Sequence, residues 1–215
     1  MGERQIILWR HGRTSWNAER RFQGQSDIEL DDEGRAQAER AAELLAYLKP
    51  DRIIASDLAR AWATAQALSA RTGVHVTADA RLRETFAGEW EGLSRAELLE
   101  RHGDEVARWA SDSAARPGGG ETRIEVADRV VAAITDGLDE VVESGTLVVA
   151  THGGAARAGI GALLELPPEQ WACLGVLSNC AWSILSENTT GFGPAWRLQE
   201  YNAGSLPTPA LADDR

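Results

Sequence analysis

Two short apolar runs, each leading into a histidine followed by glycine, constrain this chain most. The first, Ile6–Trp9, passes directly into Arg10 and His11, and the second, Leu147–Ala150, leads to His152. Apolar runs of this length are typical of strands buried in a parallel sheet. Ligands of open α/β sheets bind outside the carboxyl ends of the strands. We therefore expect both histidines to lie at one edge of such a sheet.

Arginine and histidine side chains at a sheet edge favour a phosphate site. A histidine can attack phosphorus and carry the phosphoryl group, which divides one difficult displacement into two easier steps. We expect His11 to be this nucleophile, and Arg10 and Arg60 to neutralise the phosphoryl oxygens through bidentate hydrogen bonds. His152 would add a further donor. Glu84 is the candidate for proton transfer to the leaving oxygen.

Glu84 must hold a proton to act as the acid. Burial and the negative phosphate favour its protonated form, whereas Arg81 and Arg83 oppose that form if they face the site. We expect burial and the phosphate to prevail.

Six short motifs follow one another along the chain and together span roughly residues 4–202. They are Arg10–Asn17 (RHGRTSWN), Phe22–Asp27 (FQGQSD), Leu30–Ala38 (LDDEGRAQA), Ser56–Ala65 (SDLARAWATA), Leu82–Glu84 (LRE) and Thr151–Gly154 (THGG). In this order they resemble the motifs of the histidine phosphatase superfamily, the phosphoglycerate-mutase-like enzymes.

The resemblance implies the same division of roles as the chemistry. It makes His11 the phosphorylated nucleophile and Glu84 the acid and base. It makes Arg10, Arg60 and His152 the phosphate clamp.

Asn17 and Gln23 fall where the family makes further phosphate or substrate contacts, and Gly153, beside His152, is a further candidate for substrate binding. Arg13 departs from the family, which usually has Glu or Gln after the glycine, and this concerns the rim of the pocket. Trp16 lies between two motif residues and is a candidate for the pocket mouth.

Two segments are similar to the phosphatase branch of the superfamily, Glu84–Leu93 (ETFAGEWEGL) and Pro117–Thr122 (PGGGET). The chain lacks the longer insert with which true mutases hold a bisphosphoglycerate. Two segments near the end, Asn179–Trp182 and Trp196–Asn202, are similar to glucosyl-3-phosphoglycerate phosphatases.

These patterns predict a metal-independent phosphomonoesterase that acts on a small phosphorylated metabolite and needs no cofactor. The resemblance suggests glucosyl-3-phosphoglycerate as substrate. A phosphoglycerate mutase, an α-ribazole phosphatase and a non-catalytic phosphate-binding module stay open as alternatives.

A metal site of two histidines and one carboxylate is also conceivable from His11, His152 and Glu84. The fixed charges of Arg10 and Arg60 beside these groups would repel a divalent cation. We therefore expect no metal ion.

Composition excludes several other classes. The 215 residues carry a net charge of −11, which argues against nucleic acid or an anionic membrane as partner. No apolar stretch resembles a signal peptide or approaches the ~20 residues of a membrane span. We expect a cytoplasmic protein with a small metabolite as its partner, and a homodimer stays open. Cys173 and Cys180 are expected to be buried free thiols.

Alternating strand and helix patterns predict an α/β fold, a three-layer α/β/α sandwich with a mostly parallel central sheet and a small helical cap. We expect one domain over residues 1–203, a cap insertion at about 85–120, and a flexible tail over 204–215. The expected helices run from a cap at Asp31 to Leu48, over 61–68 and over 126–141. The expected strands lie at 52–55, 74–77, 181–185 and 196–201. Capping boxes are expected at Ser94–Glu97 and Thr122–Glu125.

Overall fold

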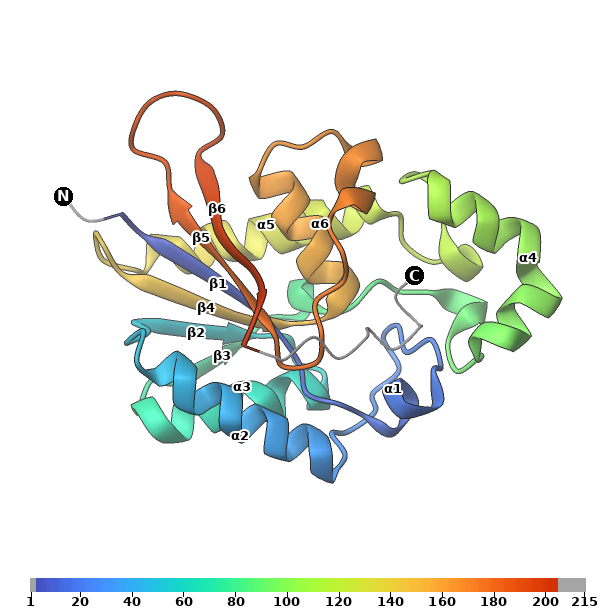
Figure 1. Cartoon of the computed structure of the whole chain (residues 1–215), viewed down its shortest axis with the longest axis horizontal. Helices are drawn as coiled ribbons and strands as arrows, with labels where there is room; N and C mark the ends of the chain where they lie inside the picture. Colours follow the sequence, from blue (N-terminus) through green and yellow to red (C-terminus); the bar gives the residue numbers. More distant parts are fainter. Residues whose placement is uncertain (1–2, 205–215) are drawn as a thin grey trace.

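A six-stranded β-sheet forms the centre of the computed structural model, which describes residues 3–204 (Figure 1). The strand order across the sheet is β3-β2-β4-β1-β5-β6. The strands are β1 (Gln5–Arg10), β2 (Arg52–Ala55), β3 (Val76–Ala78), β4 (Thr146–Thr151), β5 (Trp182–Glu187) and β6 (Trp196–Ala203).

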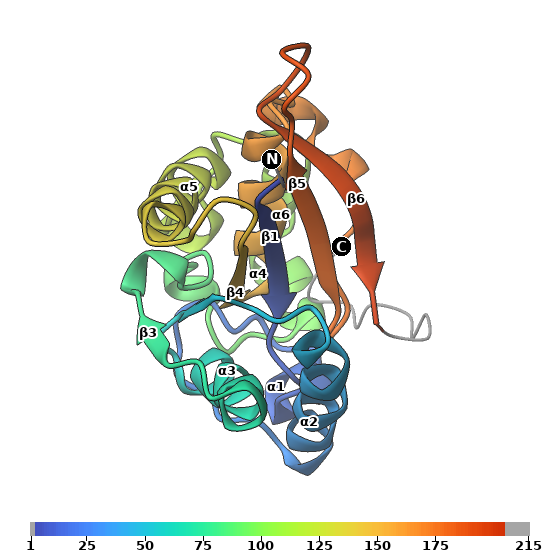
Figure 2. The ribbon, with the colours of Figure 1, turned by 90° about the vertical axis from the view of Figure 1, so that its left-hand side faces the viewer.

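The four strands β3, β2, β4 and β1 run parallel, and β5 and β6 complete the sheet as antiparallel strands. Figure 2 shows this antiparallel pair at one edge of the sheet, beside β1. Strands β1 and β4 are neighbours, with Arg10 opposite Thr151. The residues that follow them, His11 and His152, therefore emerge side by side. This confirms the predicted edge.

Helices cover both faces of the sheet. Figure 1 shows α5 and α6 on one face and α2 and α3 on the other. The helices are α1 (Ser15–Glu19), α2 (Asp32–Ala46), α3 (Ala59–Thr72), α4 (Arg95–Ser111), α5 (Arg123–Asp139) and α6 (Gly153–Leu163). Short 3-10 helices are η1 (Ala80–Leu82), η2 (Gly88–Trp90), η3 (Pro117–Gly119) and η4 (Pro168–Cys173).

Successive side chains of a strand point to opposite faces, and β1 shows how this builds two cores. Ile6 and Leu8 pack in the cluster under α5 and α6. Ile7 and Trp9 pack in the cluster under α2 and α3. The predicted three-layer α/β/α architecture is therefore confirmed.

The predicted capping residues begin three of these helices. Asp31 accepts a hydrogen bond from the Gly34 amide at the start of α2. Ser94 and Thr122 each form a full capping box at the starts of α4 and α5. These predictions are confirmed because a cap depends only on residues within one helical turn.

The segment expected to form the cap contains η2, α4 and η3. Its own small apolar cluster includes Trp90 and Leu98, with Phe22 and Trp109 packed against it. Helix α4 has a non-helical residue, His102 (φ −133°), within its length. The helix continues beyond this kink to Ser111, and its second part carries Trp109, which lies beside Arg123 of α5.

Both cysteines are free, as expected, but only Cys180 is buried. Cys173 is exposed at the end of η4, so the prediction of its burial was wrong. Apart from Gly204, the expected tail lies outside the described residues. Within residues 3–204, no helix combines the length and the apolar character needed to cross a bilayer.

Candidate active site

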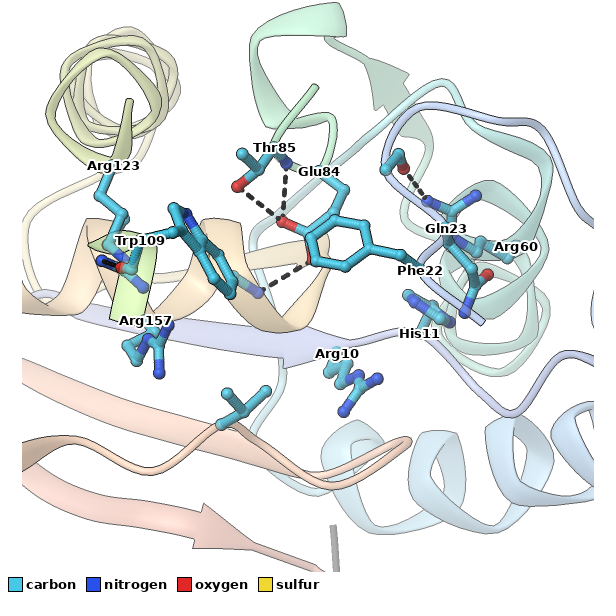
Figure 3. Close-up of a pocket in the computed structure, with 14 residues that line it drawn as sticks. Arg10, His11, Phe22, Gln23, Arg60, Glu84, Thr85, Trp109, Arg123 and Arg157 are labelled. Atoms are coloured by element: carbon cyan, nitrogen blue, oxygen red, sulfur yellow. Dashed lines mark hydrogen bonds between the residues drawn. The ribbon is translucent and has the colours of Figure 1, made fainter. Parts of the chain in front are cut away.

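A pocket opens where the carboxyl ends of the strands meet the N-terminus of α6 and the inner face of α4 (Figure 3). The residues that line it are Arg10, His11, Phe22, Gln23, Gly24, Arg60, Glu84, Thr85, Trp109, Arg123, Gly154, Arg157, Ala158 and Val176. Four of the five predicted catalytic residues are therefore on its wall.

His11 follows β1 directly and is only 3% exposed. Its Nδ1 lies 2.7 Å from the carbonyl oxygen of Gly12. Because a carbonyl only accepts, Nδ1 carries the proton and donates, which leaves the lone pair on Nε2. Burial, and then the charges of Arg60 and Arg10, hold the pKa of His11 well below its ordinary value. The imidazole is therefore neutral, with a lone pair on Nε2.

Arg60 lies in the first turn of α3 and is fully buried. Its Nη1 donates to the Ser26 carbonyl at 2.8 Å, its Nη2 to the Gly24 carbonyl at 2.7 Å, and its Nε to Nδ1 of His152 at 3.2 Å. Burial lowers its pKa to about 10, so it remains protonated at neutral pH. Each Nη has a second N–H that these two bonds do not use.

His152 follows β4 and is fully buried behind Arg60, so it does not itself line the pocket. Its Nδ1 accepts from Arg60, so the proton is on Nε2, which lies 2.9 Å from Oγ of Ser56 and donates to it. Burial and the charge of Arg60 keep its pKa well below its ordinary value. In this arrangement His152 positions Arg60, and its expected contact with phosphate stays a prediction.

Glu84 is held at the N-terminus of α6. Its Oε1 accepts from the amides of Thr85 (2.8 Å) and Ala155 (2.9 Å), and its Oε2 accepts from the amide of Gly154 (2.9 Å). These three amides fix the orientation of both carboxyl oxygens. Gly154 is required here, because a Cβ at this position would lie 2.7 Å from Oε1. Glu84 is thus fixed by contacts that sequence reasoning did not anticipate.

The two arginines that flank Glu84 in the sequence point elsewhere. Arg81 pairs with Asp79 and Asp136, both at 2.7 Å, and Arg83 pairs with Asp57 at 2.6 Å. Their charges are thus matched by aspartates outside the pocket. The inward orientation that would have opposed the acid role does not occur.

Arg129 of α5 fixes the backbone that carries Glu84. Its guanidinium donates to the carbonyls of Arg81 (2.7 Å), Arg83 (2.5 Å) and Glu84 (2.9 Å). The same group pairs with Glu121 at 2.8 Å. Sequence reasoning missed this residue, since nothing local distinguishes it from a surface arginine of an amphipathic helix.

The three further predicted contact residues take different places. Gln23 lines the pocket, and its Oε1 accepts from the Thr14 hydroxyl at 3.1 Å. Asn17 is not among the described lining residues, because it completes the capping box of α1 with Thr14 and accepts from Nδ2 of Asn179. Gly153 is the first residue of α6, where a Cβ would approach the Arg10 guanidinium to 3.4 Å.

The two residues expected at the rim pack away from the pocket. Arg13 pairs with Asp31, the N-cap of α2, at 2.8 Å. The half-buried indole of Trp16 lies over Gly92. Neither is among the described lining residues.

The comparisons with known proteins agree with this geometry. The model of the histidine phosphatase superfamily (branch 1) matches residues 6–203. A glucosyl-3-phosphoglycerate phosphatase of Mycolicibacterium vanbaalenii is 38% identical over 95% of this chain and 97% of its own. A probable phosphoglycerate mutase, GpmB, of Salmonella paratyphi C is 37% identical over 96% of this chain and 97% of its own.

Among solved structures, a mycobacterial glucosyl-3-phosphoglycerate phosphatase in complex with VO3 superposes with a TM-score of 0.87. The two are 40% identical, and the match covers 94% of this chain and all of the other. The chain therefore belongs to branch 1 of the histidine phosphatase superfamily and is a phosphatase that acts on phosphomonoesters.

Proposed function

We propose that the protein hydrolyses a small phosphorylated metabolite through a phosphohistidine at His11, without a metal ion. The observation that carries this proposal is the hydrogen bond from Nδ1 of His11 to the carbonyl of Gly12. It leaves the lone pair on Nε2 of a neutral imidazole that shares the pocket with Arg10 and Arg60. A nucleophile and a fixed positive charge are the two requirements of phosphoryl transfer.

In the first step, Nε2 of His11 attacks phosphorus, and the bond between phosphorus and the leaving oxygen breaks. Glu84 gives its proton to that oxygen, so the alcohol leaves without a charge. In the second step, Glu84 takes a proton from water, whose oxygen attacks phosphorus. The P–N bond breaks, inorganic phosphate leaves, and both residues return to their starting states.

Arg10 and Arg60 supply the charge for which many phosphatases use metal ions. The Nη1 of Arg10 is anchored by the carbonyl of Leu177 at 2.6 Å, so this guanidinium is preorganised. Fixed cations also repel a divalent ion. We expect activity to survive exhaustive chelation with EDTA. Loss of activity on chelation, restored by zinc or iron, would contradict metal independence.

The substrate that we propose is glucosyl-3-phosphoglycerate, and the relatives of that name, similar over nearly the whole chain, support it. A phosphoglycerate mutase is the second candidate, because a relative named as a probable phosphoglycerate mutase is 37% identical over 96% of this chain. The two differ in whether water or a second phosphoglycerate takes the phosphoryl group from histidine.

A panel of phosphorylated metabolites, with and without bisphosphoglycerate, separates these candidates. We expect phosphate release from glucosyl-3-phosphoglycerate, and little 2-phosphoglycerate from 3-phosphoglycerate at any bisphosphoglycerate level. Rapid cofactor-dependent interconversion of the phosphoglycerates would make the mutase correct. Preferential hydrolysis of α-ribazole phosphate would also refute the proposed substrate.

A further inference from the structure

Two arginines line the pocket away from the nucleophile. In Figure 3, Arg123 and Arg157 lie with Trp109 on one side of Glu84, and His11 and Arg60 lie on the other. Arg157 belongs to α6, whose first turn holds Glu84, and Arg123 begins α5. Residues three and four apart share a helix face, so Gly154, Arg157 and Ala158 form one wall of the pocket.

In the described part of the chain, neither of these arginines forms an ion pair with a carboxylate. Arg123 donates to the carbonyl of Trp109 at 2.6 Å and lies 4.4 Å from the centre of its indole ring. Within residues 3–204, no carboxylate lies within ion-pair distance of Arg123 or Arg157, although Asp112 and Glu169 are nearby. The carboxylate of Asp112 pairs with Arg108 instead.

The electrostatic environment of these two arginines is unfavourable. Burial, and then the charge of Arg157, lower the pKa of Arg123 to about 10. A half-buried cation beside a second cation is unfavourable unless an anion joins them. Other arginines around the acid, such as Arg81 and Arg129, are matched by aspartate or glutamate. The pair, which has no carboxylate partner within residues 3–204, therefore indicates a place for an additional anion.

A second cavity continues beyond this pair. It has a volume of about 430 Å³ and shares Trp109, Arg123, Arg157 and Val176 with the catalytic pocket. This size falls in the range of small-ligand pockets, roughly 300–1,000 Å³. A ligand can therefore extend from the phosphate site, past the two arginines, into a further chamber lined by Trp171.

We infer that Arg123 and Arg157 form a second anion subsite, which binds a carboxylate of the phosphomonoester substrate while a neutral part occupies the adjoining cavity. Guanidinium groups bind carboxylates through paired hydrogen bonds. This inference rests on the proposed function, and it makes the substrate class a phosphorylated hydroxy acid with a further polar substituent. The pair then sets specificity without taking part in the chemistry.

Two ligands that differ mainly at one group test this subsite. Glycerol 3-phosphate carries a hydroxymethyl group where 3-phosphoglycerate carries the carboxylate. Their dissociation constants are measured by calorimetry on the full chain carrying His11→Ala, which prevents turnover. We expect 3-phosphoglycerate to bind at least roughly tenfold more tightly, as charge-assisted hydrogen bonds do.

Adding Arg123→Gln or Arg157→Gln should reduce this preference to less than about threefold, because the carboxylate loses a charged partner. Adding Arg35→Gln, at an exposed arginine on α2, is the matched control and should keep it. Equal or undetectable binding of the two ligands by the parent, or a preference retained in both pocket variants, would overturn the subsite. Hydrolysis of an aryl phosphate by the native protein is measured separately, and its absence would refute the proposed function instead.

Discussion

At the scale of single residues, the two buried histidines take different positions although their ring centres are only 5.1 Å apart. His11 directs its protonated nitrogen at a backbone carbonyl and keeps its other nitrogen for the pocket. His152 uses both nitrogens within the protein, one for Arg60 and one for Ser56. His11 thus keeps one nitrogen free of these backbone contacts, and His152 holds the guanidinium of Arg60.

Arg60 is the residue whose charge we expect to be hardest to replace. Arg60→Ala removes a preorganised cation and leaves the carbonyls of Gly24 and Ser26 without their donor. We expect turnover to fall by about 10²–10³, the usual cost of one oxyanion donor. Steady-state kinetics on an aryl phosphate measures the effect, with Arg35→Ala as the control for an exposed arginine. Similar kinetics for the two variants would exclude Arg60 from the phosphate clamp.

Glu84→Gln separates protonation of the leaving group from binding. An alkoxide needs a proton to leave, and a positioned acid contributes about 10²–10⁴ in rate. A phenolate leaves without such help. We therefore expect alkyl phosphate turnover to fall severely, while the burst of phenol release from an aryl phosphate is spared. Equal losses with both substrates would mean that Glu84 only shapes the pocket.

At the scale of elements, the N-terminus of α6 positions the side chain of Glu84. In Gly154→Ala the new Cβ would lie 2.7 Å from Oε1 of Glu84, so the carboxylate must move. We expect a loss of alkyl phosphate turnover similar in kind to that of Glu84→Gln. Gly103→Ala in α4 has no atom within 4 Å of its Cβ and is the matched control. Unchanged turnover in Gly154→Ala would show that the function of Glu84 does not depend on its contacts with the N-terminus of α6.

Helix α6 is also the clearest element that sequence reasoning missed. Its residues Ala155, Ala156, Ala158 and Ile160 are all buried, so the segment has little polar stripe. A helix that is apolar almost all round gives no helical period to detect. The capping boxes at Ser94 and Thr122 were predicted correctly because their signal lies within four residues.

The residues of the site also differ in whether a local sequence pattern could predict them. His11, Arg10 and Glu84 lie within short motifs, and the structure brings them to one pocket. Arg123 and Arg157 lie outside these six motifs. The packing of α5 against α6 brings them together, so a local sequence pattern could not predict the pair. Asn17 also lies within a motif, but it contacts Thr14, whose hydroxyl donates to the pocket residue Gln23.

At the scale of the whole molecule, the parallel part of the sheet gathers the site. The chain leaves β1 at His11, leaves β2 at Ser56 shortly before Arg60, and leaves β4 at His152. Because β2, β4 and β1 are parallel neighbours, these exits lie at one edge. The cap segment then closes the far side with Trp109.

The two buried histidines make the stability of the fold depend on pH. His11 and His152 have lowered pKa values in the folded protein, so an unfolded chain binds two protons below about pH 6.5 that the folded one does not. The free energy of unfolding should therefore decrease as pH falls from about 6.5 to 5, with a slope of up to about 2.7 kcal/mol per pH unit.

Urea unfolding across this pH window measures the slope. His11→Asn should remove about half of it, while His75→Gln, at an exposed histidine, should leave it intact. A stability that is flat across the window would show that the buried histidines do not govern it.

The phosphorylated state of His11 tests the central claim most directly. The native protein is mixed with a ³²P-labelled phosphomonoester, quenched within milliseconds and digested, and the labelled peptide is identified. We predict an acid-labile, base-stable label on His11, and neither label nor turnover in a folded His11→Ala variant. Full activity of that variant, or a label on another residue, would contradict the account.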